Sequence, residues 1–481
     1  MRKDKQANRL TMGRREWLKL SGTSLASALG TTSLSSLMFA PGDADAADYK
    51  ALVCVFLYGG NDGLNTVTPM DTARYEQYAT VRGPLSLPLE SLVALAGSNY
   101  GLHPAMSSLA VAWSDKALAP VFNIGPLQRP MSKAEYRAQQ PGSSLIPESL
   151  FSHADQQLLW QASATKANTR TGWGGRASSV LETTNGVISF GGNSHFGLAP
   201  HSSQLVLPGP GSTFGVEGLS SRDIEDPSAR PRWEALQRIY AESQSNPMLE
   251  AYSRQQREAF KVSDRLGALV KKQPSEASAA LREGFAPLVS GGKITSGLGA
   301  QLFQIAKMIE GRGTVQGSRQ IFFASLGGFD THANQFGAGV ANGQHANLLK
   351  QLAQAMAGFH QAMKNIGMSD QVTLFTQSDF GRSFKPNKSN GTDHAWGNHH
   401  LVMGGAVHGG QTYGTYPELV LGGRDDVGEA EWEREGRWIP TIGVDQYAST
   451  LLKWFGASEP HLSTILPNLP SFSQKSIGFM A

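Results

Sequence analysis

The chain has 481 residues, with 42 basic and 39 acidic side chains and a formal net charge of +3. Residues 1–46 hold 7 of the basic and 4 of the acidic residues, so the rest of the chain carries 35 of each. The basic balance therefore belongs to the N-terminal segment, and it gives no support for nucleic acid or an anionic membrane as a partner. A single cysteine, Cys54, excludes an intramolecular disulfide.

The first 46 residues predict an export signal. Residues 13–19, Gly-Arg-Arg-Glu-Trp-Leu-Lys, resemble the twin-arginine signal, and residues 20–40 are apolar but diluted by Ser, Thr and Gly. Such a stretch is a poor membrane-spanning helix, and the small residues at 44–47 form a cleavage site. We therefore expect a twin-arginine signal peptide over 1–46, recognised by the twin-arginine translocase, and no permanent transmembrane segment. The mature protein, residues 47–481, is then periplasmic or secreted.

The mature region alternates apolar runs with segments of helical spacing. The runs have the length and composition of strands buried on both faces, and they cover residues 51–58, 119–124, 319–326 and 371–376. Helical periodicity lies between and after them, over residues 104–116, 345–366 and 447–455. This alternation predicts an α/β fold with a largely parallel central sheet flanked by helices. Residues 226–290 are charged and rich in Ala, Gln and Glu, which predicts a helical insertion at about 200–300.

Most of these runs end in a Gly-rich turn that holds Asp or His. In an open α/β sheet the ligand site lies at the carboxyl ends of the strands, so we expect these turns to converge. The residues in question are Asp62, Asp330, His332, Asp379 and His394. Each alone has an ordinary alternative, because Asn-Asp-Gly is a common turn and Asp-Thr-His suits a helix cap. Together they form a carboxylate and imidazole set that zinc or manganese prefers, whereas calcium favours oxygen ligands.

The order of these turns, with residues 58–65 and the closing segment 444–456, resembles the exported bacterial family catalogued as domain of unknown function 1501. The resemblance covers most of residues 50–475. That family in turn resembles the alkaline phosphatase and sulfatase superfamily. It implies an alkaline phosphatase-like α/β core that hydrolyses phosphate or sulfate esters at one or two metal ions.

The resemblance implies roles for the same residues. Asp62 matches the superfamily's first-strand metal ligand, Asp330 the next acidic ligand, and His394 its last histidine. Asp379 matches the aspartate of Ser-Asp-His-Gly, but here the following residue is Phe380. The histidine expected four residues after Asp330 is also missing, since that position is Asn334 and a histidine stands at His332. We therefore expect one divalent metal (zinc, manganese or calcium) or none, rather than a pair of zinc ions.

The nucleophile and the substrate-binding groups are less defined. In the superfamily a Ser, Thr or modified Cys attacks after the second strand, and the sulfatase cysteine pattern is absent here. Ser152 is the preferred candidate and Ser132 the second, although Ser152 also suits the N-cap of a helix over 154–160. His153 suits orientation of substrate or metal binding, and Arg382 suits a bidentate clamp on an oxyanion.

Two further histidines, His399 and His400, follow closely in the sequence. If a strand begins there, they point to opposite faces and at most one faces the site. The sequence thus predicts an exported metal-dependent hydrolase of small-molecule or polymer phosphate or sulfate esters. The alternative is a catalytically inactive secreted binding or assembly protein on the same fold, which the Phe380 departure and the missing cysteine favour. A redox protein also suits the export route, but no dinucleotide or haem signature is present.

Overall fold

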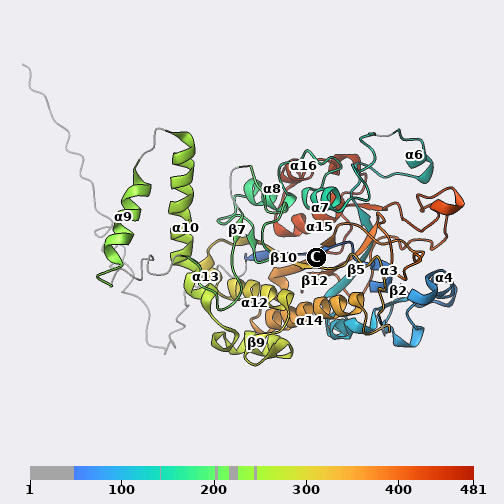
Figure 1. The fold of residues 1–481 in the computed structure, drawn as a ribbon, viewed down its shortest axis with the longest axis horizontal. Coiled ribbons are helices and arrows are strands. Elements are labelled where there is room, and N and C mark those ends of the chain that lie inside the picture. Colours follow the sequence, from blue (N-terminus) through green and yellow to red (C-terminus); the bar gives the residue numbers. More distant parts are fainter. Residues whose placement is uncertain (1–47, 141, 201–203, 216–225, 243–245, 338) are drawn as a thin grey trace, which may run out of the picture. The chain divides into compact units, whose positions relative to one another are not determined.

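The computed structural model describes residues 48–481 except 141, 201–203, 216–225, 243–245 and 338 (Figure 1). The predicted signal peptide over 1–46 therefore lies outside the described residues. Within the described part of the chain, no helix is both long enough and apolar enough to cross a membrane.

A mixed eight-stranded sheet forms the centre of the fold, in the order β13-β5-β12-β11-β1-β10-β6-β7. Every pairing is parallel except those that β12 makes with β11 and with β5. The strands are β1 (Lys50–Tyr58), β5 (Leu118–Gly125), β6 (Ile188–Ser189), β7 (Leu205–Val206), β10 (Arg319–Gly327), β11 (Val372–Ser378), β12 (Asn398–Met403) and β13 (Ile442–Gly443). The predicted α/β fold with a largely parallel sheet is confirmed, and all four predicted strands belong to this sheet.

Strand β1 shows why the sequences of these strands are unbroken apolar runs. Its side chains alternate between two separate cores: Val53 and Val55 belong to one, and Cys54 and Phe56 to the other. Because both faces of a parallel sheet are covered by helices, neither face requires polar residues. The thiol of Cys54 is fully buried, and burial raises its pKa well above the usual value, which makes it unreactive.

Helices cover both faces of this sheet (Figure 1). On one face lie α12 (Gly297–Glu310) and α14 (Gln344–Asn365), together with α5 (Ala110–Ser114). On the other lie α7 (His153–Ala162), α8 (Trp173–Val180), α15 (Val444–Phe455) and α16 (Glu459–Ile465). The predicted helix over 104–116 differs in part, because residues Pro104–Leu109 form a 3-10 helix before α5 begins.

The remaining elements are two small sheets and further helices. Two small antiparallel sheets contain β2 (Val67–Pro69), β4 (Tyr100–Leu102) and β3 (Val93–Ala94), and β8 (Val289–Ser290) with β9 (Lys293–Ile294). The segment with the charged, Ala-rich composition holds α9 (Arg230–Ala241), α10 (Pro247–Lys271) and α11 (Ala279–Phe285). Short helices elsewhere are α3 (Gly63–Thr66), α4 (Thr72–Arg82), α6 (Lys133–Arg137) and α13 (Arg312–Val315).

The central strands bring the polar turns to one edge of the sheet. Strands β11, β1 and β10 are parallel neighbours, so the residues that follow them emerge side by side. Strand β12 runs the opposite way, which places the residues preceding it at this same edge. Gly59, just after β1, has φ +111° and lies so close to the next turn that a Cβ there would be 2.5 Å from the backbone nitrogen of Asp330. Only glycine permits that approach.

Candidate metal centre

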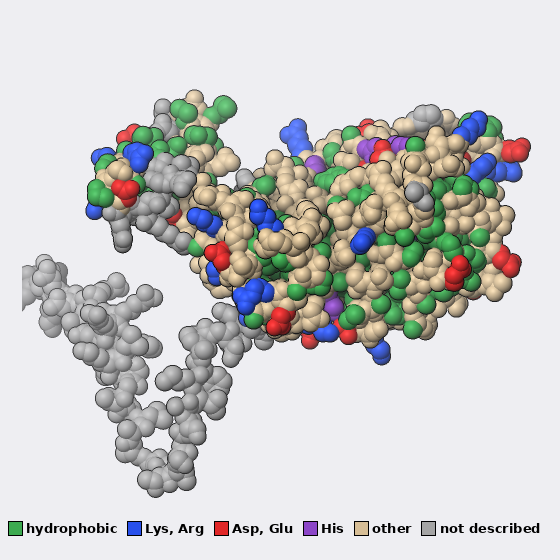
Figure 2. Space-filling model, turned by 60° about the horizontal axis from the view of Figure 1, so that its bottom comes forward, with side chains coloured by type: hydrophobic (Ala, Val, Ile, Leu, Met, Phe, Trp, Pro, Cys, Tyr) green, Lys and Arg blue, Asp and Glu red, His purple; other side chains and the backbone are tan. Residues whose placement is uncertain are grey.

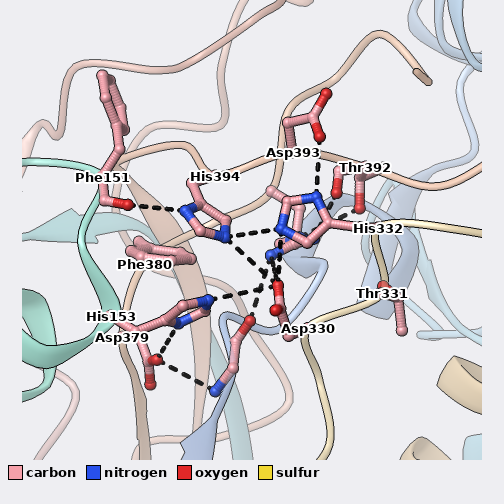
Figure 3. Close-up of polar contacts among 12 residues, drawn as sticks. Phe151, His153, Asp330, Thr331, His332, Asp379, Phe380, Thr392, Asp393 and His394 are labelled. Atoms are coloured by element: carbon pink, nitrogen blue, oxygen red, sulfur yellow. Dashed lines mark hydrogen bonds and ion pairs between the residues drawn. The ribbon is translucent and has the colours of Figure 1, made fainter. Parts of the chain in front are cut away.

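Four side chains from three segments of the chain meet at this edge of the sheet (Figure 3). Asp330 and His332 lie in the turn after β10, His394 lies in the segment before β12, and His153 is the first residue of α7. Asp330 and His332 each have 43% of their side chain exposed, so the group opens to solvent. Figure 2 shows histidine side chains at the surface beside acidic groups.

The nitrogens of three imidazoles converge on one carboxylate oxygen. Asp330 Oδ1 lies 3.0 Å from His332 Nε2, 3.3 Å from His394 Nε2 and 3.4 Å from His153 Nε2. The Nε2 atoms of His332 and His394 are only 2.8 Å apart. Ligand atoms of His153, Asp330 and His394 all lie within 4.8 Å of one another.

The second nitrogen of each imidazole has a hydrogen-bond acceptor of its own. His153 Nδ1 donates to Asp379 Oδ2 at 2.7 Å, and His332 Nδ1 donates to Asp393 Oδ1 at 2.9 Å. His394 Nδ1 donates to the backbone oxygen of Phe151 at 2.7 Å. These acceptors hold the proton of each neutral ring on Nδ1, which leaves the Nε2 lone pairs directed at one another and at Asp330. Such an arrangement is repulsive unless a cation, either a proton or a metal ion, lies among them.

The donor set fits a divalent transition metal. Histidine residues that bind metal usually donate their other N–H to a carboxylate or carbonyl, as all three do here. A tetrahedral zinc site with bonds of about 2.0–2.1 Å separates its ligand atoms by roughly 3.4 Å, close to the spacing around Asp330. Three imidazoles and one carboxylate suit zinc or manganese, whereas calcium takes oxygen ligands.

The charges of this group are set by its buried neighbours. Burial opposes ionisation of Asp330, but the hydrogen bond and charge of Arg382 outweigh it and lower the pKa of the carboxyl. The hydrogen bond to Asp379 raises the pKa of His153, against the effect of burial. Burial lowers the pKa of His394 and favours its neutral form, the form that coordinates metal.

Asp379, a predicted ligand, contacts the far nitrogen of His153 and lies outside the cluster of atoms around Asp330. Its side chain is fully buried, and its Oδ2 accepts hydrogen bonds from His153 Nδ1, from Gln157 Nε2 at 2.9 Å and from the backbone nitrogen of Gly59 at 3.2 Å. Within the described structure its Oδ1 has no hydrogen-bond partner. Asp379 therefore orients His153, and it does not join the atoms that converge on Asp330.

Asp62, also a predicted ligand, is not brought to the centre. Its carboxylate is fully buried and accepts two hydrogen bonds from the guanidinium of Arg82, at 2.7 and 2.9 Å, and a third from Gln335 Nε2 at 2.7 Å. Burial opposes its ionisation, but the charge of Arg82 and these hydrogen bonds lower the pKa of the carboxyl. A buried arginine thus occupies the oxygens that the sequence assigned to a metal.

Arg382 is buried beneath Asp330 and contacts its carboxylate instead of facing solvent. Its side chain is completely buried, and Nη1 donates to Asp330 Oδ1 at 2.8 Å and to the backbone oxygen of Gly59 at 3.3 Å. Nε and Nη2 donate to the hydroxyl and the backbone oxygen of Thr392. With these donors occupied, the guanidinium orients Asp330, and the clamp on an oxyanion that the sequence suggested has no exposed donor.

The two serine candidates differ in how they are engaged. Ser132 caps α6 in a capping box: its hydroxyl accepts from the backbone nitrogen of Glu135 and donates to the Glu135 carboxylate. Ser152 holds the N-cap position of α7, directly before His153, but its hydroxyl makes no capping hydrogen bond to the described backbone. Of the two, only Ser152 directly precedes a residue of the centre and has a hydroxyl without a capping hydrogen bond in the described structure.

Phe380 stands where the resemblance expects a histidine, and its ring packs against the imidazoles of the site. Its ring lies 4.8 Å from the ring of His153 and 4.6 Å from that of His394, between centroids (Figure 3). It therefore supports two of the imidazoles by packing. His399 and His400 lie on opposite faces of β12, against Phe122 and Trp160 respectively, and both are buried away from the centre.

The sequence offered His153 for substrate orientation or for metal binding, and it assigned no role at the site to Asp393 or to the carbonyl of Phe151. Asp393 directly precedes His394 in the sequence, which is the only local signal that could have marked it. No local pattern marks the Phe151 carbonyl, because it is backbone and lies 243 residues from its partner.

Comparisons with known proteins agree with the resemblance found in the sequence. The model of a family described as "Protein of unknown function (DUF1501)" matches residues 49–427. No curated protein matches the chain. A solved structure titled "Crystal structure of Ps i-CgsB" is 11% identical, with a TM-score of 0.36 over 89% of this chain and 77% of that chain. The PsFucS1 sulfatase from Pseudoalteromonas sp. is 11% identical, with a TM-score of 0.35 over 91% and 73%. Likenesses at this level carry no statement about substrate or reaction.

Proposed function

The chain belongs to the DUF1501 family, and we propose that it is an exported, metal-dependent hydrolase of phosphate or sulfate esters. The observation that carries the proposal is the convergence of three imidazole Nε2 atoms on Asp330 Oδ1, each ring held by a hydrogen bond at Nδ1. We assign the metal to His153, His332, His394 and Asp330. Bound there, a zinc or manganese ion supplies Lewis acidity toward an ester oxygen.

The chain's own groups then have distinct tasks. Asp379 and Asp393 hold two of the imidazoles in the tautomer that leaves Nε2 free. Arg382 holds the Asp330 carboxylate in place and keeps it ionised. Ser152 is the candidate nucleophile, because its hydroxyl is unengaged at the N-terminus of α7, where the helix dipole favours negative charge on oxygen.

The first test is elemental analysis of the purified protein, prepared without chelator or affinity-tag metal. We expect close to one zinc or manganese per chain, and hydrolysis of p-nitrophenyl phosphate, bis-p-nitrophenyl phosphate or p-nitrophenyl sulfate. His332→Ala should lose both metal and activity, whereas His408→Ala, at an exposed histidine outside the centre, should lose neither. A protein that takes up no metal, even when metal is added, would overturn the proposal.

A second function is supported by the number of ligands and by the burial of Arg382. Three imidazoles and a carboxylate complete four-coordination, which is typical of structural zinc sites, whereas catalytic sites keep a position open. Together with the burial of Arg382, this favours a secreted binding or assembly protein stabilised by metal. Stoichiometric metal without hydrolysis of any of the three esters, and with a thermal stability that depends on the metal, would favour this second function.

A further inference from the structure

Two cavities lie between α6 and the segment 415–441, and they meet at one arginine. The larger has a volume of roughly 800 Å³, and the smaller roughly 240 Å³. Arg137, the last residue of α6, lines both. Its guanidinium is held by Glu429 of the larger cavity at 3.0 Å and by Glu433 of the smaller at 3.3 Å. Arg137 therefore lies on the boundary between the two cavities, and we refer to both together as the groove.

The smaller cavity borders the metal centre through Phe151. This residue lines the cavity, and its backbone oxygen accepts the hydrogen bond from His394 Nδ1. The guanidinium of Arg437, another lining residue, lies 4.8 Å from the centroid of the Phe151 ring. Phe151 would thus contact both a molecule bound in the smaller cavity and His394, one of the residues assigned to the metal.

Charges in the groove are balanced within each cavity. The larger is lined by three basic residues and three acidic ones, which are Lys133, Arg137, Arg424, Glu418, Asp425 and Glu429. The smaller is lined by two of each, which are Arg137, Arg437, Glu433 and Glu435. Arg424 pairs with Glu418 and Arg437 with Glu435, while Lys133 Nζ donates to three backbone oxygens. Because both cavities share Arg137, the groove as a whole has four basic and five acidic residues and offers no excess of positive charge to an anion. Its donors and acceptors stand side by side, as vicinal hydroxyl groups require.

An exposed aromatic ring completes the groove. Trp432 lines the smaller cavity with 79% of its surface exposed. The apolar face of the Trp432 ring stacks on no other ring among the described residues. Paired arginine and glutamate side chains line the same cavity. The C–H face of a sugar ring is apolar and its edge carries hydroxyl groups, so it complements both features.

We propose that this groove binds a neutral oligosaccharide chain, with one sugar unit stacked on Trp432 and hydroxyl groups bonded to the arginine and glutamate pairs at Arg137 and Arg437. The binding of the oligosaccharide does not depend on the proposed function. The further step, that this oligosaccharide is the sugar part of an ester held at the metal centre, rests on the proposed function. The class of substrate would then be an ester of a carbohydrate rather than of a small aliphatic alcohol.

The test is titration calorimetry of the purified protein with cellohexaose, maltohexaose and xylohexaose. We expect at least one to bind with a Kd below about 1 mM. Trp432→Ala should weaken that binding at least about fivefold, because it removes the stacking face but leaves the core untouched. Tyr252→Ala, at a half-exposed aromatic of α10 that lines neither cavity, is the matched control and should bind as the unaltered protein does.

Asp330→Ala separates this proposal from the function proposed above. It removes the centre of the metal site but no lining residue of the groove, so oligosaccharide binding should persist while metal and hydrolysis are lost. Failure of all three hexasaccharides to bind, or equal binding by Trp432→Ala, would overturn the groove assignment whatever the metal analysis shows.

Discussion

At the candidate metal centre, the hydrogen bond at Nδ1 decides whether Nε2 of each imidazole can act as a ligand. Asp379, Asp393 and the Phe151 carbonyl are acceptors only, so each ring keeps its proton on the far side from Asp330. These acceptors are as much a part of the candidate centre as the proposed ligands, because they orient the rings and raise their basicity.

The role of Asp393 can be tested by its removal. Asp393→Ala should weaken metal binding about 10- to 100-fold, because His332 loses the acceptor that fixes its tautomer and orientation. Competition with a chelator of known affinity measures the change. Asp155→Ala, at an acidic residue of α7 with no role in the centre, is the control. Equal metal affinity in the Asp393 variant would mean that His332 is positioned by something other than this carboxylate.

Asp62 contributes to stability and not to the candidate metal centre, because its carboxylate pairs with the buried Arg82. Asp62→Ala should destabilise the protein by about 3–5 kcal/mol, because it leaves a buried arginine without a counter-charge. The same variant should keep its full metal content per folded chain. Denaturant unfolding and elemental analysis measure the two quantities, and Arg82→Met should give a similar loss of stability. Loss of metal from folded Asp62→Ala would restore Asp62 as a ligand.

Among the elements, α10 depends on a contact from α12 at its C-terminal end. Lys307 of α12 is 1% exposed, and its Nζ donates to the backbone oxygens of Leu269, Val270 and Lys272 at 3.0, 3.0 and 2.7 Å. The last carbonyls of a helix have no partner within it, and a cation is favoured there by the helix dipole. Lys307 therefore ties the end of α10 to the core.

Replacement of this lysine should loosen α10. Lys307→Met keeps the length of the side chain but leaves three carbonyls without a donor, which should cost about 2–4 kcal/mol. Hydrogen exchange should accelerate most in residues 262–272. Lys350→Met, at an exposed lysine of α14, should leave both quantities unchanged. Uniform acceleration across the chain would instead indicate global destabilisation with no special link to α10.

For the whole molecule, buried neutral histidines set the response to acid. Burial lowers the pKa of His103, His399 and His400 to about 3 and that of His345 to about 4, from 6.5. Between these values the unfolded chain binds more protons than the folded one, so stability falls as pH drops below about 6.5. Each of the four groups should cost about 1–2 kcal/mol at pH 5.

Denaturant unfolding between pH 7.5 and 5 measures this dependence. Burial raises the pKa of Asp445 to about 6, so this group acts in the opposite direction and favours the folded state as pH falls from 6 to 4. The histidines outnumber it, and the net change should be a loss of stability. Unfolding free energies that stay constant over this range would contradict burial of these four rings in their neutral form.

The positions of the chemistry-bearing turns could be predicted from the sequence, and their partners could not. Unbroken apolar runs such as residues 51–58 require cover on both faces, so a parallel sheet and a polar edge at its carboxyl ends follow from local pattern. On that basis five residues are expected to converge, and of these Asp330, His332 and His394 lie within 3.3 Å of one another in the structure, whereas Asp62 and Asp379 face other partners. The pairing of Asp62 with Arg82 and of His153 with Asp379 needs the folded chain, because loops and α7 decide which side chain reaches which.

What the sequence by itself determined is the α/β alternation, with its buried strands and its Gly-rich turns holding Asp and His. These properties depend on neighbours a few residues apart, where periodicity and turn chemistry act. Only the tertiary structure decided that Arg82 takes the oxygens of Asp62, that Arg382 is buried, and that His153 completes the centre. A carboxylate has the same local sequence whether it meets a metal, an arginine or an imidazole, and the difference arises only when distant segments fold against one another.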